Sequence, residues 1–141
     1  MKRKQFGKTS LEVSLLTYGC GAVGGLMTKG SSEDQDRAVA WARDNGINHF
    51  DTAPSYGDTI SETNLGRALG TNREGIVVST KVGFSQSELE DVNAATQNSL
   101  NASLHRLRQD HVGICQLPVS YTHLRAHETR GNLVCRLLLE K

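Results

Sequence analysis

Three residues in the first part of the chain have side chains suited to proton transfer: Asp51, Tyr56 and Lys81. Asp51 follows the run 47–50, and Lys81 follows the β-branched run 76–80, so both stand where a strand is expected to end. Tyr56 lies in the loop just beyond Asp51. A charged residue at a strand end can be an ordinary solvated side chain, but loops at strand ends also carry much of the function of proteins.

Together the three residues form a unit that could protonate a carbonyl oxygen. A tyrosine is a weak acid, since an unperturbed phenol has a pKa of about 10. A neighbouring lysine ammonium favours the phenolate and therefore eases release of the proton, and a carboxylate can fix the position of that lysine. The sequence predicts Tyr56 as general acid, Lys81 as the group that assists it and Asp51 as the anchor of Lys81.

Strand and helix patterns alternate along the chain, and this predicts how the three residues are positioned. A short hairpin is expected first, and then strands separated by helices that start near Ser32, at a Ser61 cap and near Leu89. The expected strands cover residues 15–18, 47–50, 76–80 and 111–117. Such alternation is typical of parallel strands with helical crossovers, and in a parallel barrel the functional residues gather at the C-terminal ends of the strands.

The glycines that follow the first expected strand allow two interpretations. Gly19, Gly21 and Gly24 fit the G-x-G-x-x-G pattern of a Rossmann dinucleotide-binding domain, and the next strand ends in the acidic Asp51. In that fold the helix opens within the motif, near Ala22. Here the glycines continue to position 30 and the serine cap follows, so we expect a loop without helix over 19–30, which favours a parallel barrel. The helix after it is expected to bury an apolar stripe that includes Trp41.

Several segments resemble the motifs of the aldo-keto reductase family. N-H-F-D-T-A-P-S-Y-G at 48–57 resembles the signature F-D-T-A-x-x-Y-G, S-E-T-N-L-G-R-A-L at 61–69 resembles S-E-x-x-L-G-x-A-L, and V-S-T-K-V-G at 78–83 resembles the family's T-K strand. F-G-K-T, L-E-V-S and Y-G between positions 6 and 19 are similar to its N-terminal hairpin and first strand. The motifs occur in order, and the resemblance covers about residues 4–117.

The resemblance implies an α/β fold, a parallel (β/α)8 TIM barrel. A full barrel takes about 250 residues, so only about its first half is expected here: the hairpin and roughly three and a half βα units. It also implies an NADPH- or NADH-dependent oxidoreductase that reduces aldehydes or ketones, with Tyr56, Lys81 and Asp51 in the roles above. Gly19, Cys20, Gly21 and Asp51 would lie near the nicotinamide riboside. A non-catalytic regulatory protein on the same fold remains an alternative.

The end of the resemblance departs from the family. Gln116 and Leu117 match its Q-L-H motif, but Pro118 stands where the family has the histidine that orients the carbonyl. The following V-S-Y-T-H-L at 119–124 can be reverse-translated into a transposon-end sequencing adapter, and the rest of the tail fits the same source. We therefore expect residues 1–118 to be the N-terminal part of a barrel and 119–141 to be a non-native tail, and the fragment itself to be inactive.

Composition and charge narrow the possible partners. The 141 residues carry a formal net charge of +1 and contain no long apolar run, so neither nucleic acid nor a membrane is expected as a partner, and a cytoplasmic location is expected. The family resemblance implies a small-molecule carbonyl substrate. Three widely spaced cysteines argue against a disulfide framework. No metal site is expected, because His123, His127 and Cys135 form only an isolated weak pattern. The oligomeric state cannot be predicted.

Overall fold

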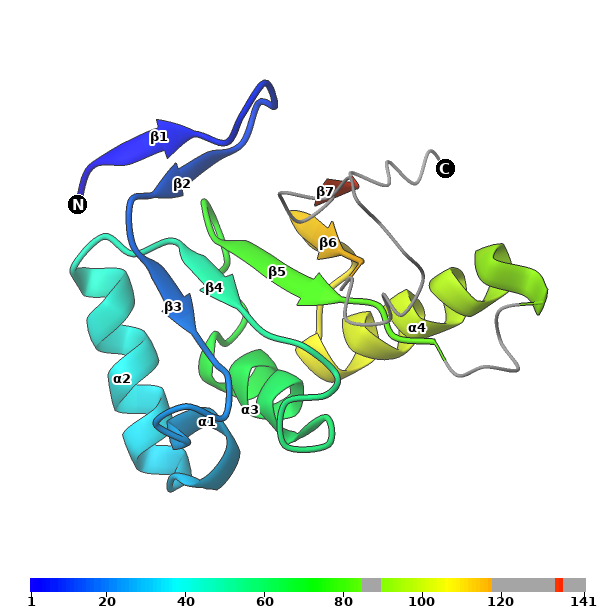
Figure 1. Ribbon diagram of the computed structural model, residues 1–141. Coiled ribbons are helices and arrows are strands. Elements are labelled where there is room, and N and C mark those ends of the chain that lie inside the picture. The colour runs from blue at the N-terminus through cyan, green and yellow to red at the C-terminus, as the bar shows by residue number, and fades with distance from the viewer. Residues whose placement is uncertain (85–89, 118–133, 136–141) are drawn as a thin grey trace.

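The computed structural model describes residues 1–84, 90–117 and 134–135, which form a sheet with helices on one of its faces (Figure 1). The strands are β1 (Arg3–Gln5), β2 (Glu12–Ser14), β3 (Thr17–Gly19), β4 (His49–Asp51), β5 (Val77–Lys81), β6 (Ile114–Gln116) and β7 (Val134–Cys135). The helices are α1 (Leu26–Lys29), α2 (Ser32–Asp44), α3 (Ile60–Ala68) and α4 (Val92–Leu107). The predicted tail, residues 119–141, lies outside the described residues except for the backbone of β7.

The main sheet has the order β3-β4-β5-β6-β7, and its first four strands are parallel. The predicted hairpin is present as the separate antiparallel pair β1-β2. Helices connect the parallel strands, as the alternating pattern predicts. This arrangement confirms the first part of a parallel α/β barrel. Strand β7 pairs with β6 in the antiparallel direction, which departs from the all-parallel arrangement of a complete barrel.

The glycine-rich segment is mostly loop, and α2 begins after it. Ser31 caps α2 by accepting a hydrogen bond from the backbone N–H of Asp34, close to the predicted helix start. A Rossmann motif requires this helix to begin near Ala22, and α2 does not. The expectation of no helix at all over 19–30 is wrong, because the four residues of α1 form one short turn of helix. They are the longest stretch of this segment without glycine, which lowers the entropic cost of helix formation.

The core lies between the helices and one face of the sheet. Phe50 and Val78 point into it and pack with residues of α2, α3 and α4, including Val39, Leu65 and Leu107. Neighbouring residues in a strand point to opposite faces. The residues on either side of Phe50, His49 and Asp51, therefore belong to the other face, which lines the interior of a barrel. The strand alternation thus separates the apolar core from the polar candidate site.

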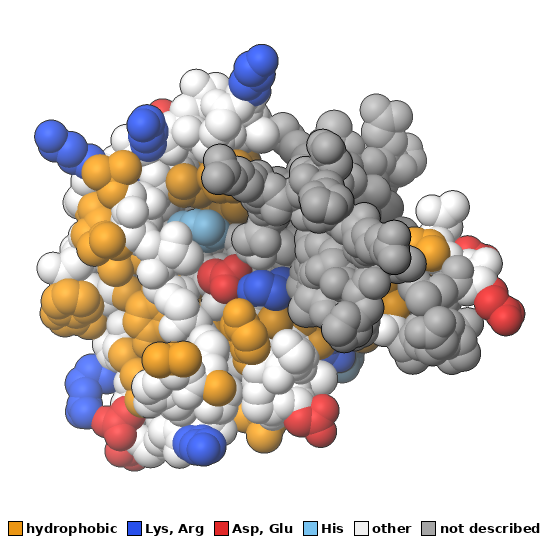
Figure 2. Space-filling view, viewed as in Figure 1, with side chains coloured by type: hydrophobic (Ala, Val, Ile, Leu, Met, Phe, Trp, Pro, Cys, Tyr) orange, Lys and Arg blue, Asp and Glu red, His pale blue; other side chains and the backbone are white. Residues whose placement is uncertain are grey.

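Three sequence-based expectations about packing are wrong. Trp41 is 63% exposed, because α2 buries the face that carries Gln35, Val39 and Ala42. Trp41 lies two residues after Val39, which places it on nearly the opposite side of the helix. Leu15 and Leu16 are also exposed rather than in a buried strand, because they precede β3 at the edge of the described sheet. Figure 2 shows the resulting hydrophobic side chains over α2 and β3.

The third wrong expectation concerns the residue at which α3 starts. Thr59, not Ser61, is the N-cap residue, and its side chain makes no capping hydrogen bond. Ser61 lies within the helix, and its hydroxyl donates to the backbone carbonyl of Cys20 at 2.8 Å. The residue that resembles a helix cap in the sequence instead connects α3 to the loop after β3.

Gly66 allows α3 and α4 to approach closely, and its substitution by alanine is expected to destabilise the fold. A Cβ at this position would lie 2.5 Å from the backbone oxygen of Arg106 and 2.8 Å from the Cα of Leu107. Since backbone cannot move aside as a side-chain tip can, we expect Gly66→Ala to lower the free energy of unfolding by about 3 kcal/mol. Urea denaturation measures this value. Gly83→Ala is the control, because a Cβ there meets no atom within 4 Å, and equal losses in both variants would contradict the prediction.

Candidate active site

The C-terminal ends of the four parallel strands bring the predicted residues to one edge of the sheet. In the strand register, Gly19 lies beside Asp51 and Asp51 lies beside Ser79. Lys81, two residues further along β5, lies beside Gln116 at the end of β6. Because parallel strands all end at the same edge, residues far apart in the chain become neighbours there.

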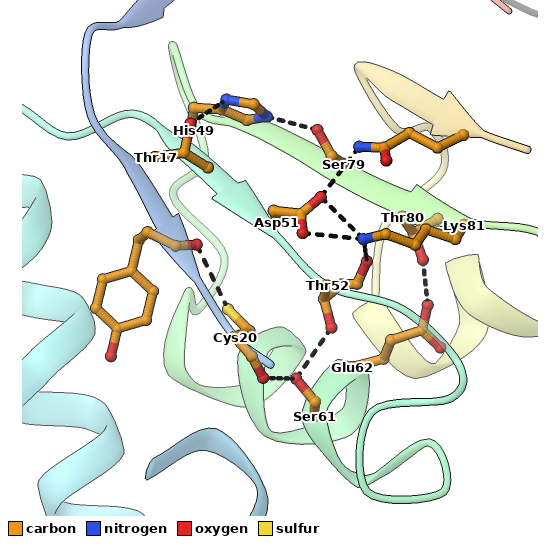
Figure 3. A network of polar contacts seen from close by, with 12 residues as sticks. Thr17, Cys20, His49, Asp51, Thr52, Ser61, Glu62, Ser79, Thr80 and Lys81 are labelled. Carbon is orange, nitrogen blue, oxygen red and sulfur yellow. Dashed lines mark hydrogen bonds and ion pairs between the residues drawn. The ribbon is translucent and has the colours of Figure 1, made fainter. Parts of the chain in front are cut away.

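Lys81 and Asp51 form an ion pair at this edge (Figure 3). The Nζ atom of Lys81 lies 3.1 Å and 2.9 Å from the two carboxylate oxygens of Asp51, and it also donates to the backbone carbonyl of Thr52 at 3.0 Å. The side chains of Lys81 and Asp51 are 18% and 26% exposed, so the pair is partly desolvated yet open on one side. Three acceptors therefore fix the ammonium group, as the anchoring role predicted for Asp51 requires.

Tyr56 lies against the same ammonium group. The Nζ atom of Lys81 is 4.8 Å from the centroid of the Tyr56 ring, a cation–π distance. On the other side, a Cβ at Gly21 would lie 3.6 Å from Cε2 and Cζ of the tyrosine, so the glycine loop passes directly beside the ring. The structure thus brings Tyr56, Lys81 and Asp51 together, and it puts Gly21 next to the tyrosine and Gly19 next to the aspartate. Their roles stay predictions.

Cys20 contributes its backbone to this region, while its thiol is buried on the core side. Its N–H donates to the backbone oxygen of Asp51 at 2.8 Å, and its carbonyl accepts from Ser61. Burial, followed by the nearby Asp51 carboxylate, raises the pKa of the Cys20 thiol to about 12, although Lys81 opposes the shift. The thiol is therefore protonated at neutral pH and is not a nucleophile. Any cofactor contact at position 20 would be made by the backbone.

Gln116 is a site residue that sequence reasoning did not assign. Its Nε2 atom donates to Oδ1 of Asp51 at 3.1 Å, so this oxygen accepts hydrogen bonds from both Gln116 and Lys81. The sequence does offer one indication of this role, since Gln116 lies near the end of the fourth expected strand, at the same edge of the sheet as Lys81. The contact restrains Asp51 from the side opposite Gly19.

A polar layer lies next to the ion pair, toward the N-terminal ends of the strands and on the same face of the sheet. The two ring nitrogens of His49 lie within hydrogen-bonding distance of the hydroxyls of Thr17, at 2.9 Å, and Ser79 (Figure 3). A neutral imidazole can donate from one nitrogen and accept at the other, so both hydroxyls can be satisfied. Burial lowers the pKa of His49, although the Asp51 carboxylate acts in the opposite direction. The neutral form is thus the one that the fold accommodates.

We expect His49 to make the fold less stable in mild acid. The unfolded chain, with a histidine pKa near 6.5, binds a proton that folded His49 resists, so the unfolded state binds more protons as the pH falls below that value. The stability that depends on neutral His49 is fully present above pH 6.5, and it is lost as the pH falls through the pKa of His49 in the folded protein. Urea denaturation between about pH 7.5 and about pH 5 should show a smaller loss of stability for His49→Asn than for the parent. Identical pH profiles for the parent and His49→Asn would contradict this.

Two features are absent from the part of the chain that the structure describes. Within residues 1–84 and 90–117, no three or more His, Cys, Asp or Glu side chains are grouped to hold a metal ion. His123 and His127, considered in the sequence, lie outside these ranges. Among the described helices, none has the length and apolar character needed to cross a membrane.

Comparison with known proteins agrees with this geometry. The model of the aldo/keto reductase family matches residues 15–129. L-Galactose dehydrogenase of Arabidopsis thaliana is 34% identical over 114 residues, which cover 79% of this chain and 36% of that protein. A probable voltage-gated potassium channel subunit beta of the same organism is 32% identical over 133 residues, covering 86% and 39%.

Solved structures lead to the same family. An aldo-keto reductase from Bacillus halodurans, in its holo form, superimposes with a TM-score of 0.68 at 30% identity, over 83% of this chain and 40% of that one. The chain therefore spans well under half the length of these relatives. With the family model matched over most of the chain and the strand-end cluster of Asp51, Tyr56 and Lys81 in place, the chain belongs to the aldo/keto reductase family.

Proposed function

We propose that the protein carrying this segment is an NAD(P)H-dependent oxidoreductase that reduces small aldehydes or ketones to alcohols in the cytoplasm. The observation that carries the proposal is the contact of one ammonium group, Lys81 Nζ, with both the Asp51 carboxylate and the Tyr56 ring. The names of several relatives, such as L-galactose dehydrogenase and pyridoxal 4-dehydrogenase of Microbacterium luteolum, support redox chemistry at a carbon–oxygen bond.

The residues present fit a nicotinamide cofactor. A Cβ at Gly19 would meet no atom within 4 Å, so there is open space beside Asp51 at the end of β3. Gly21 similarly adds no side chain beside the Tyr56 ring, where a Cβ would lie 3.6 Å from ring atoms. When bound, the cofactor would supply a hydride to the carbonyl carbon. Gly19, Gly21, Asp51 and the backbone of Cys20 would form the wall against which its nicotinamide end lies.

The protein's own part in the reaction is delivery of a proton. Tyr56 would donate its phenolic proton to the carbonyl oxygen as negative charge develops there. The Lys81 ammonium, next to the ring, would stabilise the phenolate that remains. Asp51, held by Gln116, would keep the ammonium in place and prevent it from turning toward solvent.

The proposal predicts that Tyr56→Phe abolishes reduction but not cofactor binding. In a full-length protein that carries this segment, carbonyl-dependent oxidation of NADPH or NADH should fall by about 10³-fold, since general acid catalysis contributes roughly 10²–10⁴-fold. Loss of nicotinamide absorbance measures turnover, and quenching of protein fluorescence measures binding. Tyr18→Phe is the matched control, because Tyr18 packs against Phe50 on the core side, with ring centroids 5.5 Å apart. Full activity in Tyr56→Phe would contradict the assignment.

A non-catalytic regulatory role is the second candidate. It is favoured by one observation, the 32% identity to a protein named as a probable voltage-gated potassium channel subunit beta. The two candidates differ in turnover. A regulatory protein would bind NADPH and show no carbonyl-dependent oxidation with any aldehyde of a broad panel, whereas the enzyme would oxidise NADPH with at least one of them.

We also propose that residues 1–118 form the N-terminal part of the barrel and that residues 119–141 come from translated adapter sequence. The proline codon CCT at 118 would combine one native base, C, with the adapter bases CT, and histidine codons also begin with C. An independent long sequencing read across codon 118 tests this. Histidine at 118 followed by further family sequence would support the proposal, and Pro118 followed by the same 23 residues would overturn it. Since the family match continues to residue 129, the read also tests where family sequence ends.

A further inference from the structure

A second cavity lies at the opposite ends of the strands from the candidate active site. It occupies about 520 Å³ between the C-terminal ends of α3 and α4, next to the residues that precede β5 and β6. Its polar wall and apolar floor are formed chiefly by Arg73, Arg108, Gln109, His111, Ile76 and Val78. None of these residues takes part in the cluster around Asp51 and Lys81.

The hydrogen bonds around Arg73 leave mainly donors facing this cavity. Arg73 itself caps the end of α3, since its guanidinium donates to the carbonyls of Gly66 and Gly70, both at 2.8 Å. It also donates to Oε1 of Gln109 at 2.7 Å. That bond occupies the amide oxygen of Gln109, so its NH2 group is directed to other acceptors. The carbonyls that could repel an anion are thus already bound to Arg73.

Positive charge is concentrated at the same place. Burial lowers the pKa of Arg73, and the like charges of Arg108 and Arg43 lower it further, so the Arg73 guanidinium lies close enough to each of them to be repelled. Of these three residues, Arg73 and Arg108 line the cavity. Among the ion pairs of the described residues, no carboxylate lies within 4.0 Å of these three groups.

The other charged groups around the cavity reduce that positive excess but do not cancel it. Arg67 also lines the cavity, and its charge is paired with Asp36. Asp110 is the carboxylate of the cavity wall, and it is bound to the Nδ1 of His111 at 2.6 Å. In a neutral imidazole whose Nδ1–H donates to Asp110, Nε2 is an acceptor, so His111 adds no hydrogen-bond donor to the cavity.

Arg108 has a backbone conformation that its side chain does not favour. It ends α4 with φ of 55°, in the left-handed region, where glycine is the usual residue. The turn would therefore form at least as well with glycine at this position, and the arginine side chain contributes nothing that the turn needs. A ligand that binds the guanidinium would account for an arginine here.

We propose that this cavity binds a small organic phosphate monoester. Its phosphate group would accept hydrogen bonds from Arg108 and Gln109 in the positive field of Arg73, as phosphate is well matched to guanidinium donors. Its organic part would lie against Ile76 and Val78. The site is separate from the proposed reductase chemistry, and neither assignment depends on the other.

The test is a titration of the ¹⁵N-labelled protein with inorganic phosphate and then phenyl phosphate, with sodium chloride keeping the ionic strength constant. NMR follows the arginine Nε–H signals and the backbone amides around Arg73 and Arg108. We expect saturable shifts confined to the cavity, and tighter binding of phenyl phosphate because of the apolar floor. Arg108→Gly should weaken binding about tenfold, roughly the loss of one charge-assisted hydrogen bond.

The variants separate loss of the site from loss of the fold. Arg108→Gly suits the left-handed backbone, so its unfolding midpoint should equal or exceed that of the parent. Arg37→Gln removes the same charge from the exposed face of α2 and should leave phosphate affinity within twofold. Shifts that do not saturate, or equal weakening in both variants, would overturn the site. Equal affinity for inorganic and phenyl phosphate would overturn the assignment to a monoester.

Discussion

Replacement of Lys81 by methionine is expected to lower kcat of the proposed reductase by about 10³-fold, within the range that proton transfer contributes to catalysis. Methionine has a similar length and keeps the packing, but it removes the ammonium group that contacts Tyr56 and Asp51. The phenolate left after proton donation would then lose its nearest positive charge, and Asp51 would place an uncompensated negative charge near the tyrosine. Both effects raise the energy of the transition state more than that of the bound substrate.

Steady-state kinetics on a full-length protein that carries this segment checks this expectation. The decrease should appear in kcat, with KM for the carbonyl changed only slightly, because Lys81 is assigned no contact with the substrate carbon chain. Lys29→Met, at the end of α1, serves as the control for loss of a lysine and should retain full activity. A Lys81→Met protein with near-normal kcat would show that the ion pair is structural only.

The second large effect is on stability: Arg106→Leu is expected to lower the free energy of unfolding by about 3–5 kcal/mol. Glu62 is fully buried on α3, where its carboxylate accepts hydrogen bonds from Arg106 Nε at 2.6 Å and from the hydroxyl of Thr80. Removal of Arg106 leaves this carboxylate buried without a countercharge. A single hydroxyl cannot replace the lost interaction with a cation.

A double-mutant cycle separates the lost pair from lost packing. Glu62→Gln combined with Arg106→Leu should be more stable than Arg106→Leu alone, since the buried group is then neutral. Arg37→Leu, which breaks an ion pair on the exposed side of α2, should cost less than about 1 kcal/mol. Urea denaturation of the parent, the two single variants of the cycle, the double variant and Arg37→Leu measures these differences. If Arg106→Leu and Arg37→Leu lost equal stability, the buried carboxylate would not depend on its partner.

The positions of Asp51 and Lys81 could be predicted because they depend on local pattern. Each follows a short run with strand character, and parallel strands must end at the same edge of a sheet. Tyr56 follows Asp51 so closely that the loop cannot carry it far from that edge. The order of strands and the hairpin followed from the same alternation.

The contacts that depend on packing between distant elements could not be predicted. Arg106 and Glu62 are 44 residues apart and meet only because Gly66 lets two helices approach. Gln116 and Asp51 are 65 residues apart, and their contact depends on which side of β6 faces the barrel interior. Trp41 shows the opposite error, since an apolar residue in an apolar segment was assigned to the buried face although the helix turns it outward.

The register that places Asp51 beside Ser79, with Lys81 just beyond, has a consequence for how such sites can spread between genes. The acid, its lysine partner and the tyrosine all lie within one stretch in which the ion-paired residues are 30 positions apart. A single recombination event could therefore transfer the whole proposed proton-donating unit, together with the two strands and the helix that hold it. Substrate preference could then diverge in the other half of the barrel while this inherited unit stayed unchanged.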